Sequence, residues 1–324
     1  MAWGGLGGVL GPILLGSLLL GAGNTAVMLS RYAAAELDPG RPAPRAMASV
    51  LVATSVGAVV GPNLMLPSGV LAGRLDVPPL IGSYLVAAIV YLAGAAVILR
   101  TRRALPPVAQ TPTSSEPLTP AGRFAVPRRG TEGRAGLAVL AVANLVMVGV
   151  MTMAPIHLDH LGGGLWLIGV VISAHIAAMF APSAFSGWLT ERLGARHAAA
   201  GSAAVLVVAC VVGMAAAHST VVLAVAMVIL GLGWNGCLVS GSALLTHGVA
   251  AGDRPGREGL GEAAMAVAAV VGGATSGLVM ARWDYSTLAL SGAVAAAVLA
   301  TALAVGPAVG RLRMRDRHPL RRRF

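Results

Sequence analysis

The stretch AGLAVLAVANLVMVGVMTMAP, residues 135–155, decides the fold, because it carries no charged side chain along its whole length. A helix needs about 20 apolar residues to cross the hydrocarbon core of a bilayer, and this stretch meets that need. Eight further stretches are apolar over a similar length, so the sequence predicts nine transmembrane helices. Their predicted limits are 3–29, 46–71, 79–99, 135–155, 165–189, 197–217, 220–246, 259–281 and 285–309.

The composition leads to the same conclusion. Of the 324 residues, 56% are hydrophobic and 11% are charged, and the mean hydropathy is +0.81. A soluble domain usually carries about 25% charged residues, so this composition excludes a soluble enzyme, a secreted disulfide scaffold and a disordered chain. In lipid, apolar runs of this length satisfy their own backbone only as helices. The predicted fold is therefore all-α, a polytopic membrane protein with a helical bundle.

One polar segment divides the chain. Residues 100–134 hold six prolines and seven arginines, a composition typical of a linker. Three predicted spans precede this segment and six follow it. We therefore expect a partial N-terminal bundle over 1–99, a cytoplasmic linker over 100–134, a six-helix C-terminal bundle over 135–310 and a basic cytoplasmic tail over 311–324.

The basic residues indicate an orientation. All 23 are arginine, and the net charge is +11. They form no stripe with interleaved aromatic residues, so nucleic acid is not expected as a partner. All but Arg74 and Arg282 fall in alternate gaps between the predicted spans, with Arg31, Arg41 and Arg45 assigned to the first of these gaps. The positive-inside rule places these gaps and the C-terminus in the cytoplasm, and nine spans place the N-terminus outside the cell membrane.

The sequence lacks the signatures of an enzyme or a metal site. It contains no GxSxG, HExxH or GxxxxGK[ST] motif, so acyl transfer, zinc hydrolysis and ATP-driven pumping have no local signature. Cys210 and Cys237 lie in apolar runs without a histidine at metal-ligand spacing, and we expect two buried hydrophobic residues. No cofactor and no bound metal are expected.

Residues 187–196 read GWLTERLGAR and lie between two predicted spans. The pattern resembles motif A of the major facilitator superfamily, G-x-L-x-D-R-x-G-x-R, with Glu191 in place of the aspartate. The resemblance implies a gating role for Gly187, Glu191, Arg192, Gly194 and Arg196. The first glycine would let two helix ends approach closely, and the acid with the two arginines would form a charge network that biases two bundle positions. The alternative is an ordinary basic loop.

The second predicted span contains GAVVGP at residues 57–62. Gly57 and Gly61, four residues apart, favour close helix packing, and Pro62 adds a kink. The pattern resembles motif C, which occurs on the fifth helix of the superfamily and is commoner in its exporters. The motif's closing glycine pair is Met65 and Leu66 here. Helix packing by small residues alone is the alternative.

The resemblance extends over essentially the whole chain. Residues 24–36, 149–160 and 231–246 look like an actinobacterial-type branch of the superfamily, in which they fall on or just after helices 4, 7 and 10. Transporters of this kind build each half from 3+3 repeats, so the resemblance implies that the first three helices are lacking. Motif B's arginine would fall at Ser17, which argues against proton coupling through that helix. We expect an upstream in-frame extension, and no transport by this chain alone.

Polar side chains within the predicted spans are the candidates for a substrate or proton path, because burying an ionisable group is expensive. His175 would either exchange a proton or be a neutral imidazole bonded to a facing helix. Asn144, Trp234 and Asn235 lie on spans that line the central cavity if the resemblance holds, and interhelical hydrogen bonding explains an asparagine equally well. Glu262, assigned to the first turn of its helix, would either couple protons or complement the helix N-terminus.

Two functions from different classes follow. The first is a secondary active transporter that moves a small solute by alternating access, as a monomeric, proton-coupled exporter whose partners are the solute, protons and the lipid bilayer. The second is a transport-inactive truncated remnant or membrane scaffold, because only three predicted spans precede the linker.

Overall fold

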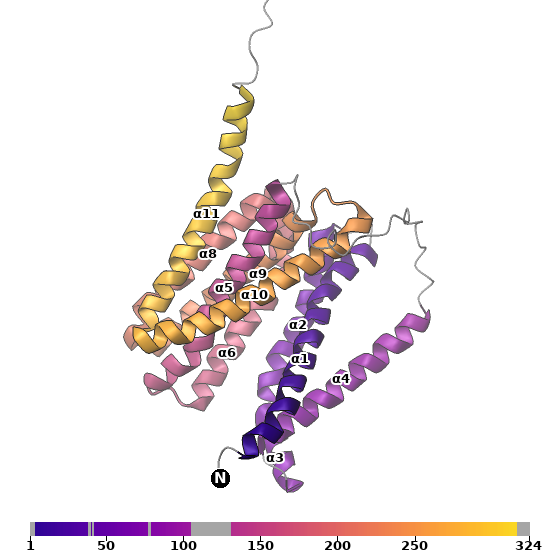
Figure 1. The fold of residues 1–324 in the computed structure, drawn as a ribbon, viewed down its shortest axis with the longest axis vertical. Helices are drawn as coiled ribbons and strands as arrows, with labels where there is room; N and C mark the ends of the chain where they lie inside the picture. The colour runs from indigo at the N-terminus through magenta and orange to yellow at the C-terminus, as the bar shows by residue number, and fades with distance from the viewer. Residues whose placement is uncertain (1–3, 38–39, 41, 77–78, 105–130, 316–324) are drawn as a thin grey trace, which may run out of the picture. The chain divides into compact units, whose positions relative to one another are not determined.

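A computed structural model describes residues 4–37, 40, 42–76, 79–104 and 131–315 of the chain (Figure 1). The described residues form helices joined by short turns, with no strand among them. Most of the predicted linker, residues 105–130, and residues 316–324 of the predicted tail lie outside this part of the chain. The helices are α1 (Gly4–Leu37), α2 (Ala43–Asn63), α3 (Met65–Arg74), α4 (Pro79–Ala104), α5 (Thr131–His160), α6 (Leu165–Phe180), α7 (Ser183–Leu193), α8 (Ala195–Met214), α9 (Thr220–Thr246), α10 (Arg254–Arg282) and α11 (Tyr285–Arg315), with 3₁₀ turns at Ala215–His218 and Ala251–Asp253.

Six of the described helical segments are long and apolar enough to cross a membrane. Their mean hydropathy lies between 1.8 and 2.3. They match the six spans predicted after the linker, which confirms an all-helical, multi-pass membrane protein. The segments are Thr131–His160, Trp166–Leu193, Ala195–Met214, Thr220–Thr246, Arg254–Arg282 and Tyr285–Val305.

Helices also lie where the sequence predicts three spans before the linker. The first of them is α1 and the third is α4. The second is divided between α2, which ends at Asn63, and α3, which begins at Met65. Since the six apolar segments all follow the linker, the count of nine spans stays a prediction.

The chain forms two compact units. Among the described residues, those up to Ser55 and those from Thr131 onward belong to one unit, and those from Val56 to Ala104 belong to the other. In the smaller unit, α3 packs against α4. The side-chain contacts described below all lie within the larger unit.

The central helix of the larger unit is α9. Five helices (α5, α6, α7, α8 and α10) pack against it, while α10 also packs on α5 and α11 packs on α8. Leu206, Leu230 and Leu245 are fully buried between these helices. Because lipid chains are as apolar as leucine, close packing is what holds such helices together. The small residues of the segment 231–242, GLGWNGCLVSGS, allow it along α9.

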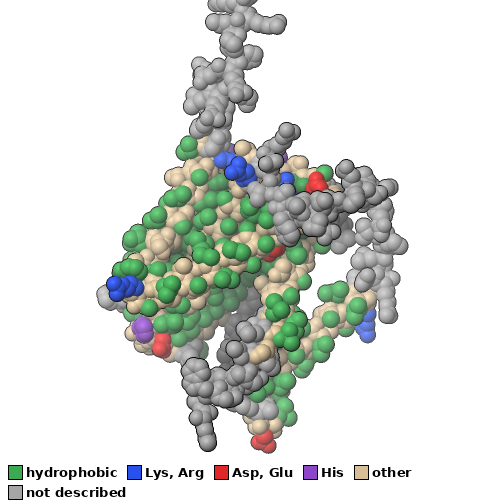
Figure 2. Space-filling model, viewed as in Figure 1, with side chains coloured by type: hydrophobic (Ala, Val, Ile, Leu, Met, Phe, Trp, Pro, Cys, Tyr) green, Lys and Arg blue, Asp and Glu red, His purple; other side chains and the backbone are tan. Residues whose placement is uncertain are grey.

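Large apolar side chains also cover the outside of the bundle. Trp166, Val221 and Val270 are each more than 70% exposed. On the face seen in Figure 2, hydrophobic side chains cover the middle of the helices, and most charged groups gather toward the ends. An exposed apolar belt of this kind suits contact with lipid.

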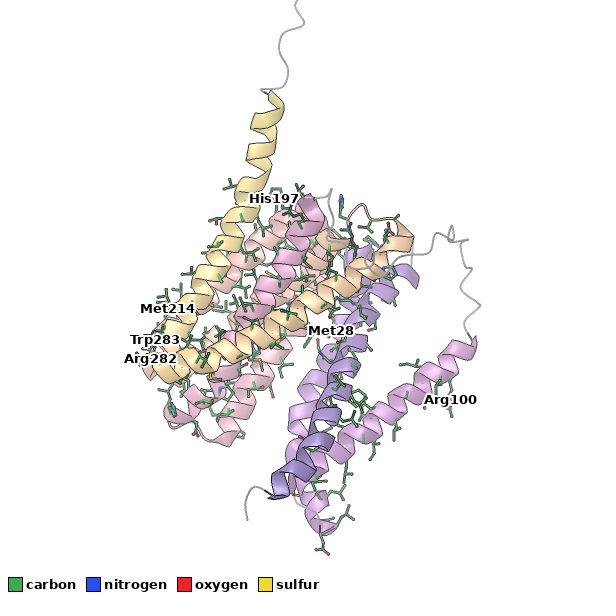
Figure 3. All side chains as sticks on the ribbon, viewed as in Figure 1. Met28, Arg100, His197, Met214, Arg282 and Trp283 are labelled. Atoms are coloured by element: carbon green, nitrogen blue, oxygen red, sulfur yellow. The ribbon has the colours of Figure 1, made fainter. Side chains whose placement is uncertain are left out.

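The two ends of the bundle differ in charge. Figure 3 shows His197 at one end and Met214, Arg282 and Trp283 at the other. The end with His197 also holds the beginnings of α5, α8 and α10 and the ends of α7 and α9. We call it the arginine-rich end, after Arg134, Arg192, Arg196, Arg254 and Arg257.

Two sequence-based assignments are wrong. Arg31 does not lie in a loop, because α1 continues to Leu37 through the helix-favouring segment YAAAE. Glu262 does not lie in the first turn of its helix, because α10 begins at Arg254, which places Glu262 in the third turn. Both corrections move a charged side chain into the interior of the bundle.

Candidate functional site

A buried ion pair joins α1 to α10. Arg31 is 1% exposed, and its Nη2 donates to Oε1 of Glu262 over 2.5 Å, while Nη1 donates to the Met28 carbonyl over 2.7 Å. Glu262 is itself buried, with 8% of its surface exposed. Removing two charges from water is costly unless they are paired and hydrogen-bonded. The pair therefore joins α1 to α10 inside the bundle.

Two hydroxyl groups extend this pair to α9. Arg31 Nη2 lies 3.2 Å from the Tyr32 hydroxyl and 3.4 Å from Oγ of Ser242, and the Tyr32 hydroxyl donates to Ser242 Oγ over 3.2 Å. The guanidinium carbon also lies 4.5 Å from the centre of the Tyr32 ring. We call Arg31, Tyr32, Ser242 and Glu262 the Arg31 cluster. Its side chains come from three helices, α1, α9 and α10.

Sequence reasoning found only one member of the Arg31 cluster as a candidate. Glu262 was identified by its charge within an apolar run, whereas Arg31 was assigned to a loop. One available signal was the lack of glycine or proline between Arg31 and Leu37, which favours continued helix.

A second ion pair lies at the arginine-rich end. Arg45 Nε of α2 lies 2.9 Å from Oε2 of Glu191 on α7. The backbones also approach here, since a Cβ added at Gly187 would lie 3.0 Å from the Pro44 carbonyl oxygen and 3.3 Å from the Ala48 Cβ. The α7 and α2 backbones therefore lie close together at Gly187.

The two arginines of the motif A segment contact other groups. Arg196 Nε donates to the Leu303 carbonyl over 2.9 Å, and its Nη1 lies 3.5 Å from Oε1 of Glu132. The Arg192 guanidinium lies 5.2 Å from the centre of the Trp188 ring. Gly194 has a φ of 82°, and it separates α7 from α8. The acid of the segment thus faces α2, while Arg196 ties α8 to α5 and α11.

His175 is enclosed by α6 and α9. It is 1% exposed, and its Nδ1 lies 2.7 Å from the Met227 carbonyl oxygen. A carbonyl only accepts, so Nδ1 carries a hydrogen and donates it. Nε2 is buried and has no hydrogen-bond partner among the described residues. This arrangement matches a neutral imidazole bonded to a facing helix.

Asn144 and Trp234 bond to each other. Trp234 Nε1 donates to Oδ1 of Asn144 over 3.1 Å, and Asn144 Nδ2 donates to the Met265 carbonyl over 2.7 Å. The Trp234 ring also meets Phe180 edge-on, with centroids 5.8 Å apart. These bonds connect α5, α9 and α10 near the middle of the bundle.

Asn235 has three partners and no exposed surface. Its Nδ2 donates to the Met179 carbonyl over 2.7 Å and lies 2.6 Å from Ser183 Oγ, and its Oδ1 accepts from Ser186 Oγ over 2.5 Å. All these partners lie where α6 ends and α7 begins.

The motif C glycines show no close neighbour. A Cβ added at Gly57 or Gly61 meets no atom of the described residues within 4 Å. Close packing at these two positions stays a prediction. The same holds for the role of the Pro62 side chain, which lies outside the described side chains.

The described residues hold no group of three or more His, Cys, Asp or Glu side chains able to bind a metal. Asp284, just before α11, accepts the Thr287 backbone N–H over 2.7 Å, which lowers the pKa of its carboxyl group. This bond caps the N-terminus of α11.

The chain is similar to membrane transporters. Residues 1–249 match the family model described as the Major Facilitator Superfamily. Two proteins of Bacillus subtilis (strain 168), each named an uncharacterized MFS-type transporter, YddS and YdeG, are both 34% identical to the chain, over 289 and 294 residues. These alignments cover 87% and 89% of this chain but 66% and 68% of the relatives. The chain thus spans about two thirds of their length.

A further relative is the riboflavin transporter RfnT of Brucella anthropi. It is 29% identical over 239 residues, which are 72% of this chain and 56% of that protein. These similarities group the chain with transporters and not with enzymes. Because the family model covers most of the chain and the Bacillus relatives share about a third of their aligned residues with it, the chain belongs to the Major Facilitator Superfamily.

Proposed function

We propose that the protein is a secondary transporter that moves a small solute by alternating access. One observation carries the proposal: two arginines of the N-terminal helices, Arg31 and Arg45, each pair with a carboxylate of the C-terminal helices, Glu262 and Glu191. Contacts between two bundles that form in one state and part in the other are how such transporters gate access. The named relatives support a transporter over a scaffold.

The proposed topology has nine spans, with the arginine-rich end in the cytoplasm of a monomer in the cell membrane. Moving Arg31 into α1 leaves the charge asymmetry almost intact, because the loops and tail on that side still hold most of the 23 arginines. In this topology, residues 100–134 form a cytoplasmic linker between a partial N-terminal bundle and the C-terminal bundle. The two ion pairs then close the cytoplasmic end.

Glu262 is the coupling group in this proposal. Protonating its carboxylate removes the charge that balances Arg31, so the pair weakens and α1 is freer to part from α10. Releasing the proton restores the pair. Proton entry through Glu262 would in this way favour opening toward the cytoplasm, and the resemblance of Gly57, Gly61 and Pro62 to motif C supports export of the solute.

The test is solute exchange in liposomes with an imposed pH gradient. Riboflavin is the first solute to try, because one relative is named for it, followed by a panel of small organic ions and neutral compounds. We expect solute movement in one direction and proton movement in the other, read from a pH-sensitive dye. This result would overturn the expectation from the sequence that this chain alone does not transport. Glu262→Gln replaces the carboxylate with a carboxamide, which is neutral at every pH. The variant should therefore exchange solute but no longer respond to the pH gradient.

The gating contact has its own pair of variants. Glu191→Ala removes the partner of Arg45 and should slow transport, while Arg192→Ala removes a side chain that contacts Trp188 and should have a smaller effect. Equal rates for wild type, Glu191→Ala and Glu262→Gln under the same gradient would contradict the proposal.

A further inference from the structure

We infer that Asn235 is a positioning residue: it holds the break between α6 and α7 and thereby orients α7, the helix that carries Glu191. The inference rests on the proposed transport function, because it assigns Asn235 to the control of a gating contact. It also gives this asparagine a different role from the substrate contact that the sequence analysis considered.

The break interrupts one membrane-spanning segment, Trp166–Leu193. Helix α6 ends at Phe180 and α7 begins at Ser183, with Pro182 between them. Proline has no backbone N–H to continue the helical ladder. The carbonyls of Met179 and Phe180 accept from side chains at this point: from Asn235 Nδ2 over 2.7 Å and from Ser183 Oγ over 2.6 Å.

Asn235 connects both sides of this break. Its Nδ2 serves the last turn of α6, while its Oδ1 accepts from Ser186 in the first turn of α7. A buried polar group without a partner is costly, so each bond opposes rotation of one helix relative to the other. Every polar atom of this amide is engaged within the bundle, which leaves none to face a solute.

The position of Asn235 is itself fixed by the face of α9 that it shares with Met227 and Gly231. These residues are spaced by four and lie one above the other on a helix. The Met227 carbonyl bonds to His175 Nδ1. At Gly231, the backbones of α6 and α9 lie so close that a Cβ would be 2.6 Å from the His175 carbonyl oxygen. Residues on three successive turns of α9 thus fix the position of α6 as far as its break.

The break orients α7, the helix that carries the proposed gating contact. α7 begins at the break and carries Gly187, which contacts α2 at Pro44, and Glu191, which pairs with Arg45. Because α7 is only 11 residues long, a rotation at its start displaces both residues together. The bonds of Asn235 therefore set whether the pair between Glu191 and Arg45 can form.

The test measures the orientation of α7 directly. Spin labels are placed at Leu193, the last residue of α7, and at Val298 on α11; both positions are well exposed, whereas Cys210 and Cys237 are buried. The protein is reconstituted in liposomes and the label-to-label distance distribution is recorded. We expect Asn235→Ala to broaden the distribution and to lower the maximal transport rate about tenfold or more, with KM for the solute little changed, because the variant loses the three hydrogen bonds of a buried side chain and the loss of even one changes a population by about that factor.

Asn144→Ala is the matched control. It also removes a buried asparagine that donates to a backbone carbonyl, but it lies on α5 and its bonds go to α9 and α10 and not to α6 or α7. Its distance distribution should equal that of the wild type. The double variant Asn235→Ala with Pro182→Ala should give a narrow distribution again, at a different mean distance, because the restored N–H lets α7 continue the axis of α6.

Three results would overturn the inference. One is an unchanged distribution in Asn235→Ala with a raised KM, which would assign the residue to the solute. The second is equal broadening in Asn144→Ala, which would indicate a general packing role, and the third is a double variant as broad as the single one. If Asn235→Ala does not fold, Ser186→Ala tests the same contact, since it removes only the bond to Oδ1. The distance measurement does not depend on transport, so failure of the proposed function is seen separately.

Discussion

Arg31 is the residue whose burial most constrains the molecule. Its guanidinium is paired with Glu262 and bonded to Met28, Tyr32 and Ser242, and its Nε has no partner among the described residues. Arginine is suited to such a position because its planar fork donates several hydrogen bonds while keeping its charge. A lysine would supply the charge but not the simultaneous contacts with α9 and α10.

The Arg31 pair gives a prediction for stability. Arg31→Met or Glu262→Leu alone leaves one charge buried without its partner and should cost about 3–5 kcal/mol. The double variant should recover most of that loss, because two apolar side chains replace both charges. Thermal unfolding of the protein in detergent checks this. The half-exposed pair of Arg45 and Glu191 is the comparison, and breaking it should cost about 1 kcal/mol or less; a double variant no better than the singles would contradict the argument.

His175 gives a prediction for pH dependence. Its Nδ1 donates to a backbone carbonyl, and its Nε2 lies buried, so the imidazole is held in one neutral form. His175→Phe should therefore leave the pH profile of transport unchanged, while lowering the thermal midpoint through the loss of the bond to Met227. Transport rates at several pH values, measured beside Glu262→Gln, check this. A profile flattened by His175→Phe would show that His175 titrates.

At the scale of the elements, α9 organises the bundle through the face formed by Met227, Gly231 and Asn235. Close approach at Gly231 brings the α6 backbone within reach of the neighbouring hydrogen bonds. Helix association in lipid depends on such small residues, because lipid chains are as apolar as the helix surfaces and the hydrophobic effect does not drive helices together. The orientation of α6 is thus set by backbone proximity as well as by side chains.

Gly231→Ala tests that proximity. The added Cβ would lie 2.6 Å from the His175 carbonyl oxygen and 3.0 Å from the Ala178 Cβ, so α6 must move. We expect a loss of about 1–3 kcal/mol, as for other overpacked interiors. Gly277→Ala on α10 is the control, because its Cβ meets no described atom within 4 Å. Thermal midpoints of the two variants should differ clearly, and equal midpoints would contradict the close approach.

Asp284 gives a prediction for the start of α11. Its carboxylate accepts the Thr287 N–H, and this bond lowers its pKa in the folded protein. A lowered folded pKa means that the stabilisation is present above the unfolded pKa and is lost as pH falls through the folded pKa. Asp284→Ala should therefore lower the thermal midpoint at neutral pH and have a vanishing effect in acid. An equal effect at both pH values would contradict the assignment of the cap.

The starts of several helices were predictable from the sequence, but the pairing of charges was not. The predicted spans 165–189, 220–246 and 285–309 begin at or next to the first residues of α6, α9 and α11, because runs of apolar residues bounded by polar turns have a clear local signal. The assignment of Arg31 to a loop was wrong for a related reason: its charge was interpreted as the end of a span. Its neutralisation by Glu262 depends on α1 packing against α10, a contact between residues far apart in the sequence.

Some residues of the candidate site were predictable from the sequence, but their roles were not. Asn144, Asn235 and His175 were identified as polar groups inside apolar runs, and all three are buried. Each bonds to a backbone carbonyl of another helix. Tertiary packing decides which helix supplies that carbonyl, and no local sequence pattern predicts it.

At the scale of the whole molecule, membership of the Major Facilitator Superfamily accounts for six apolar helices with charged ends. The proposed direction of insertion depends on the arginines of the loops and of the tail. A phosphatase that is active only outside the cytoplasm, fused after Phe324, should be inactive in cells, whereas the same enzyme inserted near Trp283 should be active. Strong activity of the C-terminal fusion would reverse the topology.

The two ion pairs differ in their contact with solvent, and this gives them different sensitivity to ionic strength. Arg45 is 47% exposed and Glu191 is 20% exposed, while Arg31 and Glu262 are 1% and 8% exposed. Dissolved salt screens exposed charges over about 8 Å at physiological concentration but affects buried pairs far less. Phosphate groups of anionic lipids compete for the exposed arginine in the same way. The outer pair would thus adjust with the salt and lipid around the protein, while the inner pair stays constant.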